Sequence, residues 1–207
     1  MKNFALKLSV MALLTAAGVH AGAASLYDNL GAVQDGSDPL LSYGPLANSF
    51  TTGTNGGFLS GIAALLKNDS ASIVGDVRVS LRADAGNTPG AELLSLGVLS
   101  SAGIATDAFS AYSFTPSAPF ALAANTTYWV EIEAASPNAV EWAWSGDLSG
   151  TGVAGQWTYN VPFGANPNSV QQPYQMAVTT AVPEPASALL LALGLGAVTV
   201  LRRRQQG

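Results

Sequence analysis

The chain has 207 residues, of which 48% are apolar and 10% are charged, and its formal net charge is −5. It contains no cysteine, which excludes disulfides, thiol catalysis, Cys-based zinc sites and iron–sulfur clusters. The acidic balance argues against nucleic-acid binding, because no basic patch is available to displace counterions from phosphates.

Residues 1–24 are predicted to be a secretory signal peptide. Lys2 and Lys7 precede a short apolar stretch at residues 8–17, and small residues follow it. A cationic lead, a short apolar region and an A-x-A pattern are typical of a leader that signal peptidase removes. The predicted cleavage region contains Ala21, Ala23 and Ala24.

Residues 25–181 are predicted to form one domain, a length that can bury a core without disulfides. This segment has twelve acidic and three basic residues, so its net charge is −9. The only histidine, His20, lies in the predicted leader, which leaves no imidazole in the mature domain. We therefore expect no cofactor.

Three aspartates near the start of this domain are weak candidates for a calcium site. Carboxylates that converge in a turn are the ligands that calcium prefers, but the spacing here is not that of an EF-hand. Aspartate, glycine and serine are also ordinary turn residues, so a plain loop is the favoured interpretation. The candidates are Asp28, Asp35 and Asp38.

The domain reads as strands that are separated by turns rich in Gly, Pro and Asn. Residues 76–82 and 126–133 alternate between apolar and polar side chains, which is the period-2 pattern of a strand with one wet face. Residues 92–99 are a further candidate strand, although their leucines also suit a helix. The remaining predicted strands cover residues 48–52, 58–66, 140–144, 156–159 and 174–179. The pattern predicts an all-β fold, an antiparallel β-sandwich or jelly roll.

One predicted strand carries the candidate ligand-binding residues. Trp129, Glu131 and Glu133 lie on the face opposite the apolar side chains, where an indole can stack on a sugar ring and carboxylates can accept hydroxyl hydrogen bonds. Glu131 and Glu133 point in parallel from one strand, whereas glycosidases flank their substrate from two sides. We therefore expect a solvated face and no catalysis. Trp142 and Trp144 are expected in the core.

The domain also resembles the choice-of-anchor domains of bacterial surface proteins. The residues that carry the resemblance are strand-and-turn patterns, chiefly residues 47–53, 77–82, 87–90 and 122–130. In that family one β-domain occurs with alternative C-terminal sorting signals. The resemblance implies a fold and an extracellular location, and it transfers no catalytic residue.

Residues 182–207 are predicted to be a sorting tail. Pro183, Glu184 and Pro185 precede an apolar run at residues 186–201, and cations follow at once. The run has 16 residues, against the roughly 20 that span a bilayer comfortably. Cations directly after an apolar helix are expected at a cytoplasmic face. The cluster consists of Arg202, Arg203 and Arg204. An ordinary membrane anchor is the alternative.

In order and spacing this tail resembles the PEP-CTERM sorting signal of Gram-negative bacteria. The resemblance implies processing near the Pro-Glu-Pro by exosortase, an integral-membrane cysteine protease. It also implies a precursor with an N-terminal signal helix and a C-terminal transmembrane-type helix, which is in the inner membrane only transiently. The expected mature form is at the cell surface or extracellular, with a non-enzymatic adhesive or structural role in an exopolysaccharide or biofilm matrix. The alternatives are a carbohydrate-binding module, with or without calcium, and a secreted hydrolase.

Overall fold

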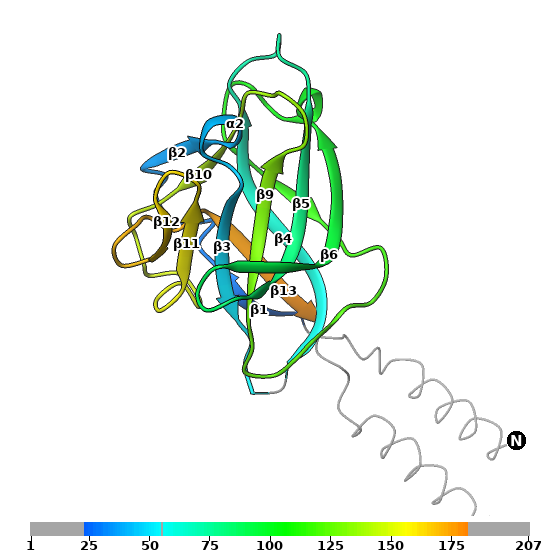
Figure 1. Ribbon diagram of the computed structural model, residues 1–207, viewed down its shortest axis with the longest axis vertical. Helices are drawn as coiled ribbons and strands as arrows, with labels where there is room; N and C mark the ends of the chain where they lie inside the picture. Colours follow the sequence, from blue (N-terminus) through cyan, green and yellow to red (C-terminus); the bar gives the residue numbers. More distant parts are fainter. Residues whose placement is uncertain (1–22, 55, 182–207) are drawn as a thin grey trace, which may run out of the picture. The chain divides into compact units, whose positions relative to one another are not determined.

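The computed structural model describes residues 23–54 and 56–181, which form one unit (Figure 1). The predicted signal helix and the predicted transmembrane-type helix lie outside these residues, as do Ala21, Pro183, Glu184, Pro185, Arg202, Arg203 and Arg204. Within the described part of the chain, no helix is long and apolar enough to cross a bilayer.

Sheet A has seven antiparallel strands, and five of them follow the order β1-β13-β4-β10-β2. The long strand β4 also pairs with β7 and β8. The strands of sheet A are β1 (Ala23–Asp28), β2 (Gly36–Pro39), β4 (Gly57–Asn68), β7 (Ser110–Phe114), β8 (Ala121–Leu122), β10 (Val140–Trp144) and β13 (Met176–Ala181).

Sheet B has six antiparallel strands in the order β12-β11-β3-β9-β5-β6. Two short helices, α2 (Leu40–Tyr43) and η1 (Ser101–Gly103), lie in connections. The strands of sheet B are β3 (Leu46–Thr51), β5 (Asp76–Asp84), β6 (Pro89–Ser100), β9 (Thr127–Ala134), β11 (Trp157–Asn160) and β12 (Gly164–Pro167). Residues 92–99 are thus a strand, which decides between the two interpretations of their leucines.

The two sheets pack face to face over a single core, as the alternating patterns require (Figure 1). Sheet A contributes Ile62 and Trp142, and sheet B contributes Leu81 and Val130, all with at most 1% of their surface exposed. The predicted all-β fold of antiparallel sheets is confirmed, whereas the jelly-roll alternative stays a prediction.

Strand β1 begins inside the region in which leader cleavage is predicted. Ala23 and Ala24 lie opposite Ala181 and Thr180 at the end of β13. Cleavage after Ala23 would remove one paired residue and leave the rest of β1 in the sheet. The cleavage itself stays a prediction.

Candidate functional site

Charged side chains gather on the outer face of sheet B, because the register of β5 and β9 brings them opposite one another. Arg78 lies opposite Glu133 across the strand pair. Its Nη1 lies 2.9 Å from Glu133 Oε1, and its other terminal nitrogen pairs with Glu92 of β6. Both glutamates raise the pKa of the Arg78 guanidinium. These three residues form a half-exposed ion-pair cluster at the surface of the sheet.

A second ion pair on this face is buried. Arg82 Nε lies 2.6 Å from Glu131 Oε1, and Glu131 is only 4% exposed. Burial raises the pKa of the Glu131 carboxyl, and the positive charge of Arg82 opposes that shift. Glu131 and Glu133 do share one face, as the alternation predicted. Each is held by its own arginine, however, so the pair does not have the arrangement of a glycosidase acid and base.

Trp129 lies beside this pair on the outer face of β9, on the side away from the core residues Tyr128 and Val130. Its indole is nevertheless 0% exposed. The indole nitrogen donates a hydrogen bond to Asp84 Oδ1 at 2.8 Å, and Asp84 begins the turn between β5 and β6. Strand β6 of the β5–β6 hairpin crosses over β9 (Figure 1).

Trp129 thus lies on the predicted outer face, but its indole, a weak candidate for glycan contact, is not an exposed platform. Period-2 alternation indicates correctly which face of the strand the residue occupies. It does not indicate that a neighbouring hairpin covers that face. A sugar could stack on this ring only after the hairpin had moved away.

The three candidate calcium ligands do not converge. Asp28 accepts a hydrogen bond from the backbone N–H of Leu30, whereas Asp35 accepts one from the backbone N–H of Gly146 at 2.7 Å. Asp38 accepts one from the Tyr174 hydroxyl at 2.6 Å. Among residues 23–54 and 56–181 no group of three acidic, histidine or cysteine side chains could hold a metal ion. The three weak candidates therefore do not form a shared site in the described residues, because each carboxylate satisfies a different part of the fold.

Asp38 belongs instead to a buried polar network between the sheets, which the sequence analysis missed. Asn48 Oδ1 accepts hydrogen bonds from the Tyr174 backbone N–H and the Thr158 hydroxyl, both at 3.2 Å. Thr158 also donates to Asn168 at 2.6 Å. Burial, with Asp38 nearby, raises the pKa of Tyr174, which stays a neutral phenol. Asn48 lies two residues from each of the core residues Leu46 and Phe50. Because side chains two apart on a strand share a face, the sequence could have placed Asn48 on the inner face.

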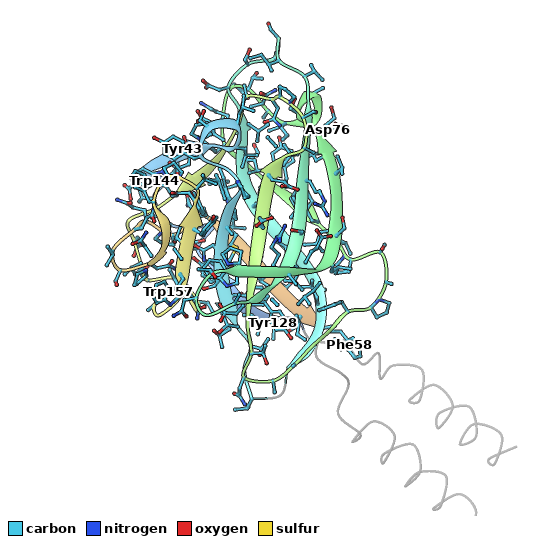
Figure 2. All side chains as sticks on the ribbon, in the orientation of Figure 1. Tyr43, Phe58, Asp76, Tyr128, Trp144 and Trp157 are labelled. Carbon is cyan, nitrogen blue, oxygen red and sulfur yellow. The ribbon has the colours of Figure 1, made fainter. Side chains whose placement is uncertain are left out.

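The remaining tryptophans divide between the core and the surface. Trp142 stacks on Tyr174 with ring centroids 4.7 Å apart. Trp144 packs against Gly36, where an added Cβ would lie 2.1 Å from the indole. Both occupy the core side of β10, as expected. Trp157 and Tyr159 lie on the outer face of β11 and are half-buried, and Figure 2 labels Trp157 at one edge of the molecule.

The comparisons with known proteins concern the tail. Residues 181–205 match the family described as PEP-CTERM protein-sorting motif. No curated protein and no solved structure gives a significant match to the chain. The matched segment begins at Ala181, the last residue of β13, so the motif starts where the sandwich ends. The chain carries a PEP-CTERM sorting motif, which implies an exported protein that exosortase processes.

Proposed function

We propose that this protein is delivered by its tail to the cell surface or the extracellular matrix, where the β-sandwich has a non-enzymatic adhesive or structural role. The resemblance of the body to choice-of-anchor domains supports this location. Partners on this proposal are signal peptidase and exosortase during export, and extracellular polysaccharide afterwards.

The observation that carries the proposal is that the last described strand of the sandwich ends where the motif begins. Ala181 lies opposite Ala23 of β1 and Phe58 of β4, so β13 is hydrogen-bonded on both sides up to its last residue. Among the described residues, the ladder pairs of β13 therefore run up to the point at which the motif begins. A motif that begins at the last residue of the sandwich is suited to be a removable address.

The surface of the domain supports a role with neutral or cationic matrix components. Its three basic residues, Lys67, Arg78 and Arg82, are all in ion pairs with acidic neighbours. The excess negative charge is thus left unbalanced, which repels polyanions and keeps the domain soluble.

Replacement of the motif tests the proposal. We expect Pro183→Ala, Glu184→Ala and Pro185→Ala together to leave an unprocessed precursor in the membrane fraction, whereas wild-type protein reaches the surface or the medium. Fractionation and immunoblotting in the native host measure this. Equal surface delivery of the variant would contradict the proposal.

A specific carbohydrate-binding module is the second candidate, and the half-buried aromatics of β11 favour it. Trp157 and Tyr159 are two residues apart on one outer face, an arrangement that suits stacking on successive sugar rings. Binding to a glycan array that is lost in Trp157→Ala and kept in Trp129→Phe would support this candidate. Equal binding by wild type and Trp157→Ala would contradict it.

A further inference from the structure

An apolar groove lies at the end of the sandwich from which the tail departs. It has a volume of about 510 Å³ and is lined by Phe58 and Leu59 of β4, by the loop of residues 115–119 and by Ala181. Phe58 is 45% exposed, and Figure 2 labels it at the opposite end of the molecule from Tyr43. Two prolines of the loop, Pro116 and Pro119, stiffen one wall.

Chain length places the sorting motif next to this groove. Ala181 is part of the groove wall, and Pro183 follows two residues later. An extended chain spans at most about 3.6 Å per residue, so Pro183 lies within about 7 Å of Ala181 and Pro185 within about 14 Å. An enzyme that cleaves near the motif must therefore bring its own surface up to the groove.

The walls of the groove are uncharged, in an otherwise acidic domain. No Asp, Glu, Lys or Arg occurs in residues 52–66, 108–130 or 148–181, which include both walls. An uncharged apolar surface can be buried against a partner without the cost of desolvating a charge. The composition and the position of the groove thus suit a protein partner that acts on the tail.

We propose that this groove is a docking site for the membrane-embedded sorting protease that reads the PEP-CTERM motif, an inference that rests on the proposed function. The protease recognises the motif in its active site and, at the same time, an apolar element of its own surface enters the groove and contacts Phe58. Docking holds the folded domain next to the active site and raises the rate of processing.

A matched pair of phenylalanine variants tests this inference in the full-length protein. We expect Phe58→Asp to slow processing at least roughly tenfold, the loss typical of a central apolar anchor of an interface. Phe163→Asp is the control, because Phe163 is also a surface phenylalanine, 65% exposed, and contacts Tyr43 away from the groove. Pulse–chase labelling in the native host measures the rate.

A second variant guards against misfolding, because Phe58 lies in a paired strand. Ser117→Asp adds a charge to the loop wall outside any strand and is expected to slow processing as well. Normal processing of both groove variants would overturn the inference. If the double variant Pro183→Ala, Glu184→Ala is also processed at the normal rate, the proposed function is contradicted as well. If the double variant is processed slowly and the two groove variants are processed normally, only the docking site is contradicted.

Photocrosslinking distinguishes the protease from the bilayer as the occupant. A benzophenone amino acid at position 58 is expected to form an adduct with the epitope-tagged sorting protease, and the same amino acid at position 163 is not. An adduct with lipid alone at position 58 would overturn the inference in favour of a membrane contact.

Discussion

At the scale of single residues, polar side chains on the outer face of sheet B bind neighbouring strands and a turn of the same sheet. Asp84 accepts the indole N–H of Trp129 and the backbone N–H of Gly86 and Asn87, so one carboxylate joins the turn to β9. Arg82 holds the buried carboxylate of Glu131. Trp129 and Glu131, which the sequence suggested as ligand contacts, thus attach the β5–β6 hairpin to β9.

We expect Asp84→Ala to lower the free energy of unfolding by about 1.5–3 kcal/mol, the usual contribution of hydrogen bonds to a charged group. The indole N–H of Trp129 would lose its acceptor, and the turn would lose its side-chain cap. Urea denaturation followed by tryptophan fluorescence measures the change. Asp147→Ala is the control, since Asp147 caps only an exposed turn at Ser149; equal losses in the two variants would contradict the role of Asp84.

The buried carboxyl of Glu131 gives the stability of the domain a pH dependence of known sign. Because burial raises its pKa in the folded state, the folded chain binds more protons than the unfolded chain between the two pKa values. Its contribution to stability is therefore greatest below the unfolded pKa and falls as pH rises through the raised folded pKa. We expect Glu131→Gln to remove this part of the slope in urea titrations at mildly acidic pH. An unchanged slope would contradict the assignment.

At the scale of elements, the alternation of side chains predicted the central strands well. Residues 76–82 and 126–133 became β5 and β9, since a strand with one core face must alternate. Five strands, β1, β2, β7, β8 and β12, were not predicted. Strands β2 and β12 have only four residues each, which include Pro and Gly and look like turns. Segment β2 is a strand because it pairs with β10, which is far away in the chain. A local sequence pattern carries no information about that pairing.

The candidate site was predicted less completely, for a related reason. The alternation of side chains along the strand predicts that Trp129, Glu131 and Glu133 share the outer face, and the structure has them there. The cover over Trp129 depends on how the β5–β6 hairpin bends. The partners of Asp35 and Asp38 come from segments more than 100 residues away in the chain, whereas Asp28 binds its near neighbour Leu30. The sequence contains the donors and acceptors but not their distances.

Edge strand β2 depends on a glycine that makes room for an indole. We expect Gly36→Ala to lower the free energy of unfolding by about 1–3 kcal/mol, the usual cost of overpacking, because its Cβ would lie 2.1 Å from Trp144. Gly31→Ala is the matched control, since an added Cβ there meets nothing within 4 Å. Thermal unfolding by circular dichroism measures both, and similar losses would contradict the packing described.

At the scale of the full chain, we expect the sandwich and the tail to be separable in function. Sheet A closes with β13, which contributes the buried side chains of Met176 and Val178 to the core. We expect a chain that ends at Ala181 to unfold cooperatively at the same temperature as one that ends at Pro185. A chain that ends at Gln175 lacks β13 and is expected not to fold. A large loss of stability on shortening from Pro185 to Ala181 would contradict the separability.

We infer that the tail is a removable address, and the mass of the mature protein is the sharpest check on that claim. Intact-mass spectrometry of protein from the surface or medium is expected to show a C-terminus near Pro183-Glu184-Pro185, without Arg202, Arg203 and Arg204. Recovery of otherwise mature protein that keeps the three arginines would contradict the claim and favour a lasting anchor.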